Sequence, residues 1–351
     1  MPSSTPTSAL PWTSQPAAKL AWLVFVMVMA VYAVGIDRTF LIDQANYLEN
    51  FAEGPTLTWA DRLVQDGWNL RTLFVGLFSE EVLWQVWTTI LGTFLSPQAA
   101  VVATVCALNL LIAFAVVRLR DPAFPLLLWL LLPVGFAETG LLQLRQGFGF
   151  AVMLYVILRF DRPILSTLVA AMIHTTFALV FPFAALAWVC RRHHILGLVL
   201  AVGMAFAAAY LGGTLFESFG GRRLATYNVT DTQATSILYV FGAALCCLPS
   251  LHRLLTEEAP DESLTTRSTL AAIAVMHVGV CAFAIFSFFF FPLGAGRVGY
   301  LIMLLLIPIL PSMRRSDSTV GLGIFSLLVV YLIYLVAKTY SEGTYDIFLY
   351  G

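Results

Sequence analysis

The stretch LQLRQG, residues 142–147, lies between two apolar runs, at about 124–142 and 146–160, that could each enter a bilayer. A second polar residue, His174, stands alone in the next long apolar stretch. An arginine at the centre of an inserted helix costs about 2.5–3.5 kcal/mol, so charged residues in such places usually serve function. Arg145 is therefore the first candidate for a functional residue.

The composition indicates a protein that crosses the membrane several times. Of the 351 residues, 60% are hydrophobic and only 11% are charged, and the mean hydropathy is +0.86. This leaves too little polar surface to cover a water-soluble globule. Residues 1–18, rich in Pro, Ser and Thr, are expected to form a disordered cytoplasmic N-terminus. Residues 19–351 are expected to form a single integral membrane domain, because the apolar runs leave no room for a separate soluble one.

The apolar runs predict an all-α fold, a polytopic transmembrane helical bundle of about 10–11 membrane segments. A first helix over 19–36 is followed by a non-cytoplasmic first loop, residues 37–97, which is periplasmic or interfacial. Within this loop, mixed helical spacing predicts a helix in the membrane interface over 59–77, and the run 82–95 is too short to cross. Further spans are expected at about 98–117, 124–142, 146–160, 195–214, 235–251, 268–291, 297–313 and 319–338.

The stretch 164–189 allows two topologies. It could be one long tilted helix, or a broken or re-entrant pair of half-length helices that meet near His174. With the N-terminus inside, the split leaves 11 of the 19 basic residues on the cytoplasmic side, against 9 for the single helix. The positive-inside rule therefore favours the split. Arg145, His174, Arg222 and Arg297 then all face the non-cytoplasmic side, where broken helices line a cavity.

Three arginines of this face have chemistry suited to a diphosphate. Arg145 and Gln146 form a fork of donors beside a glycine, an arrangement that suits bidentate recognition of phosphate. Arg222 and Arg297 are also set among glycines. Structural alternatives remain open: Arg145 could pair with Glu138, Arg222 could bind lipid headgroups, and Arg297 could be a snorkelling cation at a helix end.

His174 is a candidate general base, since a neutral imidazole can accept the proton of a hydroxyl group. The alternative is a hydrogen-bonded residue of the core, which is how we interpret His277. Asp43 and Glu81 are possible acid/base groups or partners of sugar hydroxyls, and the alternative for both is a solvated loop acid.

The sequence contains none of the motifs that are typical of several common classes of enzyme. It lacks a P-loop, an H-E-x-x-H helix, a G-x-S-x-G elbow and paired metal ligands. We therefore expect neither a metal nor another cofactor. The net charge of −1 offers no basic surface for nucleic acid, so none is expected as a partner.

The motif LRQGFGFA at 144–151, followed by MIHTT at 172–176, resembles the EpsG-like or Wzy-type polysaccharide polymerase family, which shows "R-Q-x-x-A" and then "H-x-S-A". Thr176-Phe177-Ala178 departs from the small hydroxyl-Ala pair of that pattern. Three further stretches agree in order: Asp43–Phe51 is similar to "D-x-x-x-Y-x-x-x-F", Glu81–Trp84 to "E-P-x-[FY]" without its proline, and Arg297–Tyr300 to "R-x-x-Y".

The resemblance implies a multi-pass glycosyltransferase of the bacterial inner (cytoplasmic) membrane. It would polymerise undecaprenyl-diphosphate-linked oligosaccharide repeat units into exopolysaccharide or O-antigen on the periplasmic face. Membrane lipids, a chain-length regulator and a flippase are the other partners it implies. A nucleotide is not required, because the glycosyl-diphosphate bond of the donor supplies the energy.

On this resemblance, His174 acts as the base and Arg145 stabilises the departing diphosphate. The substrate-binding residues are then Arg297, Arg222, Gln146, Asp43, Tyr47, Glu81 and Tyr300. Two alternatives remain. A GT-C-type transferase would use a lipid-monophosphate sugar, a metal and an acid such as Asp43. A non-enzymatic permease or flippase for a lipid-linked glycan would use Arg145 to bind an anion without chemistry.

Overall fold

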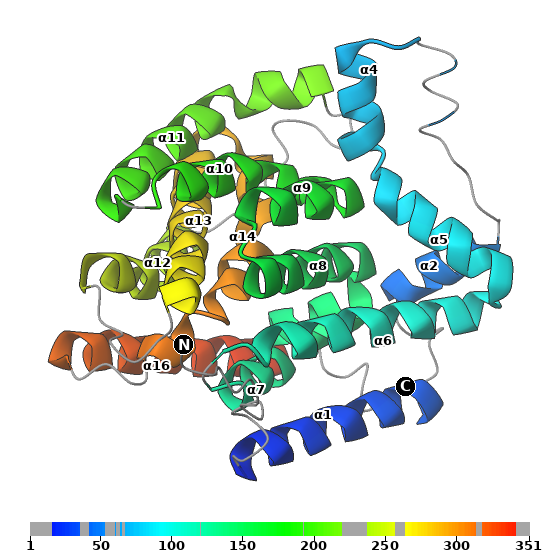
Figure 1. Ribbon diagram of the computed structural model, residues 1–351, viewed down its shortest axis with the longest axis horizontal. Helices are drawn as coiled ribbons and strands as arrows, with labels where there is room; N and C mark the ends of the chain where they lie inside the picture. Colours follow the sequence, from blue (N-terminus) through cyan, green and yellow to red (C-terminus); the bar gives the residue numbers. More distant parts are fainter. Residues whose placement is uncertain are drawn as a thin grey trace, which may run out of the picture.

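The computed structural model describes residues 16–35, 42–52, 60, 64, 67–119, 121–191, 193–219, 237–256, 264–313 and 318–341. The described chain is helical and contains no strand (Figure 1). Its helices are α1 (Pro16–Gly35), α2 (Ile42–Ala52), α4 (Leu70–Phe74), η3 (Val75–Ser79), α5 (Val82–Phe94), α6 (Pro97–Val116), α7 (Ala123–Leu131), η4 (Pro133–Leu142), α8 (Leu144–Phe160), α9 (Pro163–Ile173), η5 (Thr175–Leu179), α10 (Phe181–Val189), α11 (His194–Phe219), α12 (Ile237–Thr256), α13 (Leu264–Phe290), α14 (Pro292–Leu306), α15 (Leu310–Met313) and α16 (Thr319–Ser341).

The polytopic helical bundle expected from the sequence is confirmed. Five described helices are long and apolar enough to cross a membrane, namely α6, α11, α12, α13 and α16. A sixth crossing is possible if the bent pair α7 and η4 is one span. Shorter apolar helices, among them α9 and α14, complete the bundle. Within the interfacial helix expected over 59–77, Ala60 and Val64 are helical, and α4 begins at Leu70, where the Asn69 side chain caps it by accepting from the Thr72 amide at 2.9 Å.

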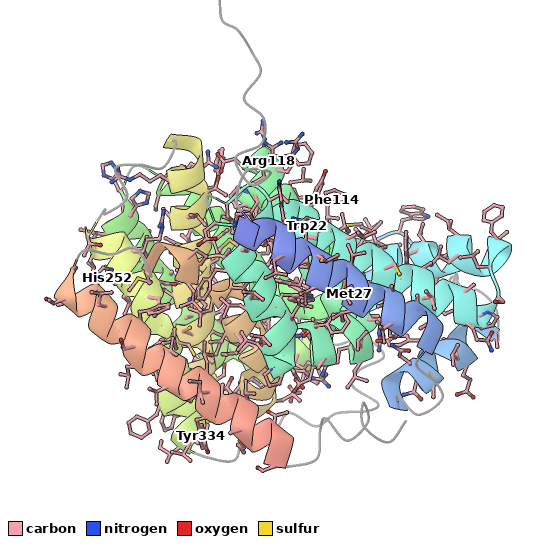
Figure 2. All side chains as sticks on the ribbon, turned by 90° about the horizontal axis from the view of Figure 1, so that it is seen from below. Trp22, Met27, Phe114, Arg118, His252 and Tyr334 are labelled. Atoms are coloured by element: carbon pink, nitrogen blue, oxygen red, sulfur yellow. The ribbon has the colours of Figure 1, made fainter. Side chains whose placement is uncertain are left out.

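The outer surface carries the apolar side chains that a lipid environment favours. Helices α1 and α16 both run across the face of the bundle seen in Figure 2, and Met27 and Tyr334 are 58% and 53% exposed there. Trp22 of α1 packs against Phe114 of α6, with ring centroids 6.4 Å apart. Only 17% of the apolar window of α16 is buried. Such an exposed apolar face is suited to lipid tails rather than to water.

The single span expected over 124–142 is wrong in one respect, because the chain bends by 70° between α7 and η4. Leu132 precedes Pro133 and adopts an extended conformation with ψ of 131°, as the proline ring disfavours the helical one. Gly135 follows, and a Cβ built there would lie 2.2 Å from the backbone oxygen of Trp129. Only glycine therefore permits the tight approach that produces the bend.

The stretch 164–189 is a broken pair, as the charge distribution favoured. Helix α9 ends at Ile173, His174 is extended (φ −148°, ψ 121°), and the chain resumes in η5 and α10. Arg191, after α10, forms an ion pair of 2.9 Å with Asp161, before α9. One straight helix between them would separate these residues by about 45 Å at 1.5 Å per residue. The pair therefore enters the bundle and returns to the same end.

Candidate active site

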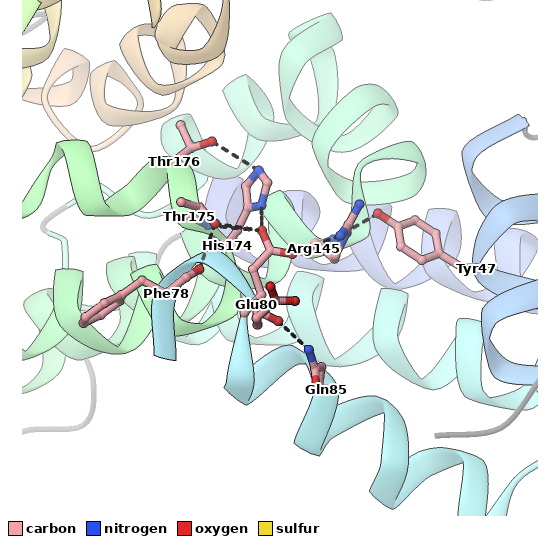
Figure 3. Close-up of polar contacts among 9 residues, drawn as sticks. Tyr47, Phe78, Glu80, Gln85, Arg145, His174, Thr175 and Thr176 are labelled. Carbon is pink, nitrogen blue, oxygen red and sulfur yellow. Dashed lines mark hydrogen bonds and ion pairs between the residues drawn. The ribbon is translucent and has the colours of Figure 1, made fainter. Parts of the chain in front are cut away.

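The centre of the site is the carboxylate of Glu81, whose two oxygens hold two other candidate residues. Oε2 lies 2.9 Å from Nη1 of Arg145, and Oε1 lies 2.6 Å from Nδ1 of His174. The backbone amide of Thr175 also donates to Oε1 at 3.2 Å. Figure 3 shows Arg145, His174 and Thr175 gathered around this point. Glu81 is fully buried, and a buried carboxylate requires such partners to offset its lost hydration.

Three separate interruptions of helical structure bring these residues together. Glu81 has a positive φ of 57° at the junction of η3 and α5. Arg145 lies in the first turn of α8, directly after η4 ends, and His174 lies in the break between α9 and η5. Helix α8 approaches η4 closely at Gly147, where a built Cβ would lie 2.0 Å from a backbone oxygen. The fold thus collects its polar groups where regular helix stops.

His174 is held on both ring nitrogens. With a hydrogen on Nδ1 it donates to Glu81, and Nε2 is then the acceptor for the hydroxyl of Thr176 at 3.2 Å. A carboxylate on one nitrogen and a hydroxyl on the other is the arrangement in which an imidazole takes a hydroxyl proton. The His174 side chain is only 10% exposed, so it contacts neighbouring side chains rather than solvent.

The Arg145 side chain is fixed at one guanidinium nitrogen and is elsewhere open to solvent. One guanidinium nitrogen bonds to Glu81, while the side chain is 37% exposed. The amide of Arg145 itself donates to the hydroxyl of Tyr47 at 3.4 Å. Because Arg145 lies at the N-terminal end of the 17-residue helix α8, the helix dipole adds to its positive charge there. The position suits an anion such as phosphate.

The alternative partner for Arg145, Glu138, is wrong. Within the described residues Arg145 forms its ion pair with Glu81. Glu138 instead lines a separate cavity of about 280 Å³.

A cavity of about 190 Å³ adjoins the site through Thr175 and Thr176. It is bordered by Arg297 of α14 and by Ser79 of η3, and most of the remaining wall is apolar. Its apolar lining residues are Phe74, Phe78, Ala178, Leu179, Ala208, Leu215, Phe216, Phe291 and Leu293. We refer to it as the Arg297 cavity. An apolar wall with one cation and several hydroxyls fits the phosphate end of a lipid.

The structure places the remaining predicted residues differently. Gln146 is buried, and its Nε2 has no hydrogen-bond partner among the described residues. Tyr47 is buried too and packs edge-on against Trp84, with centroids 5.7 Å apart. Tyr300 does not border the Arg297 cavity and lines the cavity of Glu138 instead.

Two predicted residues lie outside what the structure describes. Arg222 falls in the segment 220–236, and of Asp43 only the backbone, within α2, is described. Their assignment to the substrate stays a prediction.

Sequence reasoning missed the role of Glu81 as the shared partner of Arg145 and His174. It also missed Thr175, whose amide donates to Glu81, and Thr176, whose hydroxyl contacts His174, and both threonines border the Arg297 cavity. One signal was available: a buried cation among apolar runs needs an anion, and few acids lie close to such runs. His277 is fully buried and contacts Ser250, at 2.7 Å, as expected of a core residue.

These features define a polytopic helical membrane protein in which a buried carboxylate joins an arginine and a histidine beside an amphipathic cavity. The chain belongs to the EpsG family, whose profile matches residues 20–350. The resemblance drawn from the sequence motifs is thereby confirmed. No curated protein and no solved structure matches the chain. Family membership indicates a membrane protein of polysaccharide biosynthesis, a glycosyltransferase-like polymerase.

Proposed function

We propose that this protein polymerises oligosaccharide repeat units carried on undecaprenyl diphosphate, on the periplasmic face of the bacterial inner membrane. The growing glycan would move from its lipid carrier to the non-reducing end of an incoming unit, giving exopolysaccharide or O-antigen. The observation that carries the proposal is the assembly of Arg145 and His174 on one buried carboxylate, beside the amphipathic Arg297 cavity.

The reaction requires a base and a stabilised leaving group, and the site offers both. The acceptor hydroxyl oxygen bonds to the anomeric carbon of the donor sugar, while the bond from that carbon to the phosphate oxygen breaks. The hydroxyl proton goes to Nε2 of His174, at the position where the Thr176 hydroxyl now lies. The electron pair leaves with the diphosphate, whose charge Arg145 and Arg297 stabilise in a partly dry site.

Glu81 is a positioning residue in this scheme. It holds His174 so that Nε2 faces the acceptor, and it stabilises the imidazolium that forms when the proton arrives. Its second oxygen fixes the guanidinium of Arg145. The lipid chain of the donor would follow the apolar side of the Arg297 cavity, between α11 and η3.

The test uses the full-length protein, purified in detergent or nanodiscs, with a lipid-diphosphate-linked oligosaccharide as the sole substrate. We expect a ladder of longer glycans on gels and release of free lipid diphosphate. His174→Ala should lower the rate by about 10²–10⁴-fold, the usual contribution of a general base. Arg145→Lys keeps the charge but loses the planar fork, so polymerisation should fall strongly at normal protein levels.

Matched controls come from exposed positions. His193→Ala and Arg159→Lys make the same chemical changes on exposed side chains and should leave the ladder unchanged. Absence of any lengthening by the wild-type protein would support the permease alternative and overturn the proposal. A requirement for a lipid-monophosphate sugar and a divalent cation would support the GT-C-type alternative.

A further inference from the structure

A second cavity, of about 280 Å³, lies apart from the candidate active site. Its wall comes from η4, α12, α14 and α16, and it contains the carboxyl group of Glu138 and three aromatic rings, Tyr239, Tyr300 and Tyr331. We refer to it as the Glu138 cavity. Its volume lies near the lower end of the range of about 300–1,000 Å³ that small-molecule sites occupy. It is thus large enough for one small ring rather than a whole lipid.

Helix α14 separates the two cavities. Leu293, Gly294 and Arg297 border the Arg297 cavity, whereas Gly299, Ile302 and Met303 border the Glu138 cavity. At 3.6 residues per turn these two sets point to opposite sides of the helix, and Tyr300, which also borders the Glu138 cavity, lies between them. The Glu138 cavity is therefore a distinct site and not an extension of the first.

The two cavities also differ in charge. The Arg297 cavity holds a cation, whereas no Lys, Arg or His is among the residues that line the Glu138 cavity. Within the described part of the chain, no residue forms an ion pair or a hydrogen bond with the Glu138 carboxyl group. A phosphate placed there would meet an acid and no counter-charge. The chemistry thus selects a neutral ligand that can donate hydrogen bonds.

The sharp bend before η4 directs Glu138 into this cavity. Leu132 and Pro133, at the bend, line the cavity together with Glu138 itself. On α12, the hydroxyl of Tyr239 donates to the backbone oxygen of Ala295, which fixes the orientation of that ring. A carboxyl group on one side and oriented aromatic faces on another is the combination that sugar rings use, hydroxyls on the first and C–H faces on the second.

We propose that the Glu138 cavity is a glycan subsite that binds one neutral sugar ring of the saccharide substrate, away from the diphosphate. The inference rests on the proposed function, since it assumes a saccharide substrate. Glu138 accepts hydrogen bonds from two sugar hydroxyls, and the tyrosine rings pack against the ring faces. The subsite holds part of the glycan while the reaction proceeds on the other side of α14.

The test is a binding measurement with the repeat-unit oligosaccharide freed of lipid and diphosphate, by equilibrium dialysis against full-length protein in detergent. Glu138→Gln should weaken binding about 10-fold or more, the effect of losing a hydrogen bond to a charged group. Glu217→Gln makes the same change on an exposed side chain of α11 and should bind as the wild type does.

A second variant protects the test against a folding defect. Gly299→Leu adds a side chain whose Cβ would lie 3.4 Å from the Tyr239 ring, so it fills the cavity without removing a charge. It should abolish oligosaccharide binding. Equal binding by the wild type and both cavity variants would overturn the subsite, as would equal loss in Glu217→Gln. Binding that depends on Glu138 in a protein that lengthens no glycan would refute the proposed function alone.

Discussion

Replacing Glu81 with glutamine tests whether one carboxylate organises the site. The change keeps the shape of the side chain but removes the charge that Arg145 and His174 share. Removing one partner of a fully buried ion pair costs about 3–5 kcal/mol. Here the Arg145 side chain is 37% exposed, and solvent compensates part of its loss. We therefore expect destabilisation of about 1.5–3 kcal/mol, the range for hydrogen bonds to a charged group.

The effect on the rate should be larger than the effect on stability. A carboxylate that holds a catalytic histidine in its productive tautomer contributes up to about 10⁴ in rate. We expect polymerisation by Glu81→Gln to fall by at least 10²-fold, about the lower limit for a base that has lost its function. The assays are the glycan ladder with purified protein and thermal unfolding in the same detergent. Glu49→Gln, on an exposed side chain of α2, is the matched control.

The result that would refute this reasoning is a Glu81→Gln protein with near wild-type polymerisation. A fall in rate that simply follows the fraction of folded protein would also refute it, because Glu81 would then be structural only. Glu81→Asp should restore stability more than rate, since it keeps the charge but withdraws it from His174.

Three further predictions concern the frame around the site. Asp161→Asn keeps the left-handed turn (φ 53°) but loses the ion pair to Arg191, which is 31% exposed, so unfolding in detergent should become easier by at most about 1 kcal/mol. In membranes, a thiol reagent added from the outside should label Thr175→Cys but not His193→Cys, and the reverse pattern would contradict the proposed orientation. Gly147→Ala places a methyl group 2.0 Å from a backbone oxygen of η4, so the folded yield should drop sharply, and a normal yield would show that α8 can move aside.

The helical bundle could be predicted because apolar runs of sufficient length have few alternatives in a bilayer. The run 98–117 corresponds to α6, and 319–338 to α16, within a few residues. The bend at Leu132 was missed, although Pro133 is visible in the sequence. Hydropathy measures length and composition, whereas a bend depends on whether neighbouring helices leave space for it, as they do at Gly135.

The sequence was sufficient to single out the polar residues of the site, but not to predict which residues they contact. Arg145 and His174 stand out because their cost in an apolar run demands an explanation. Their common partner Glu81 lies 64 and 93 residues away along the chain, and no local pattern reports such a contact. Tyr300 was grouped with Arg297 because they are three residues apart, yet they border different cavities. Packing between helices decides which cavity each side chain of α14 borders, and the local sequence does not report it.

The sharing of Glu81 makes Arg145 and His174 competitors for one negative charge. When His174 becomes an imidazolium, it attracts the carboxylate more strongly, and the hold on Arg145 weakens by the same electrostatic coupling. In the proposed reaction, proton transfer to His174 would thus free the guanidinium of Arg145 for the departing diphosphate. The Glu81 carboxylate thereby couples, in the proposed reaction, the proton transfer at His174 to the diphosphate contact of Arg145.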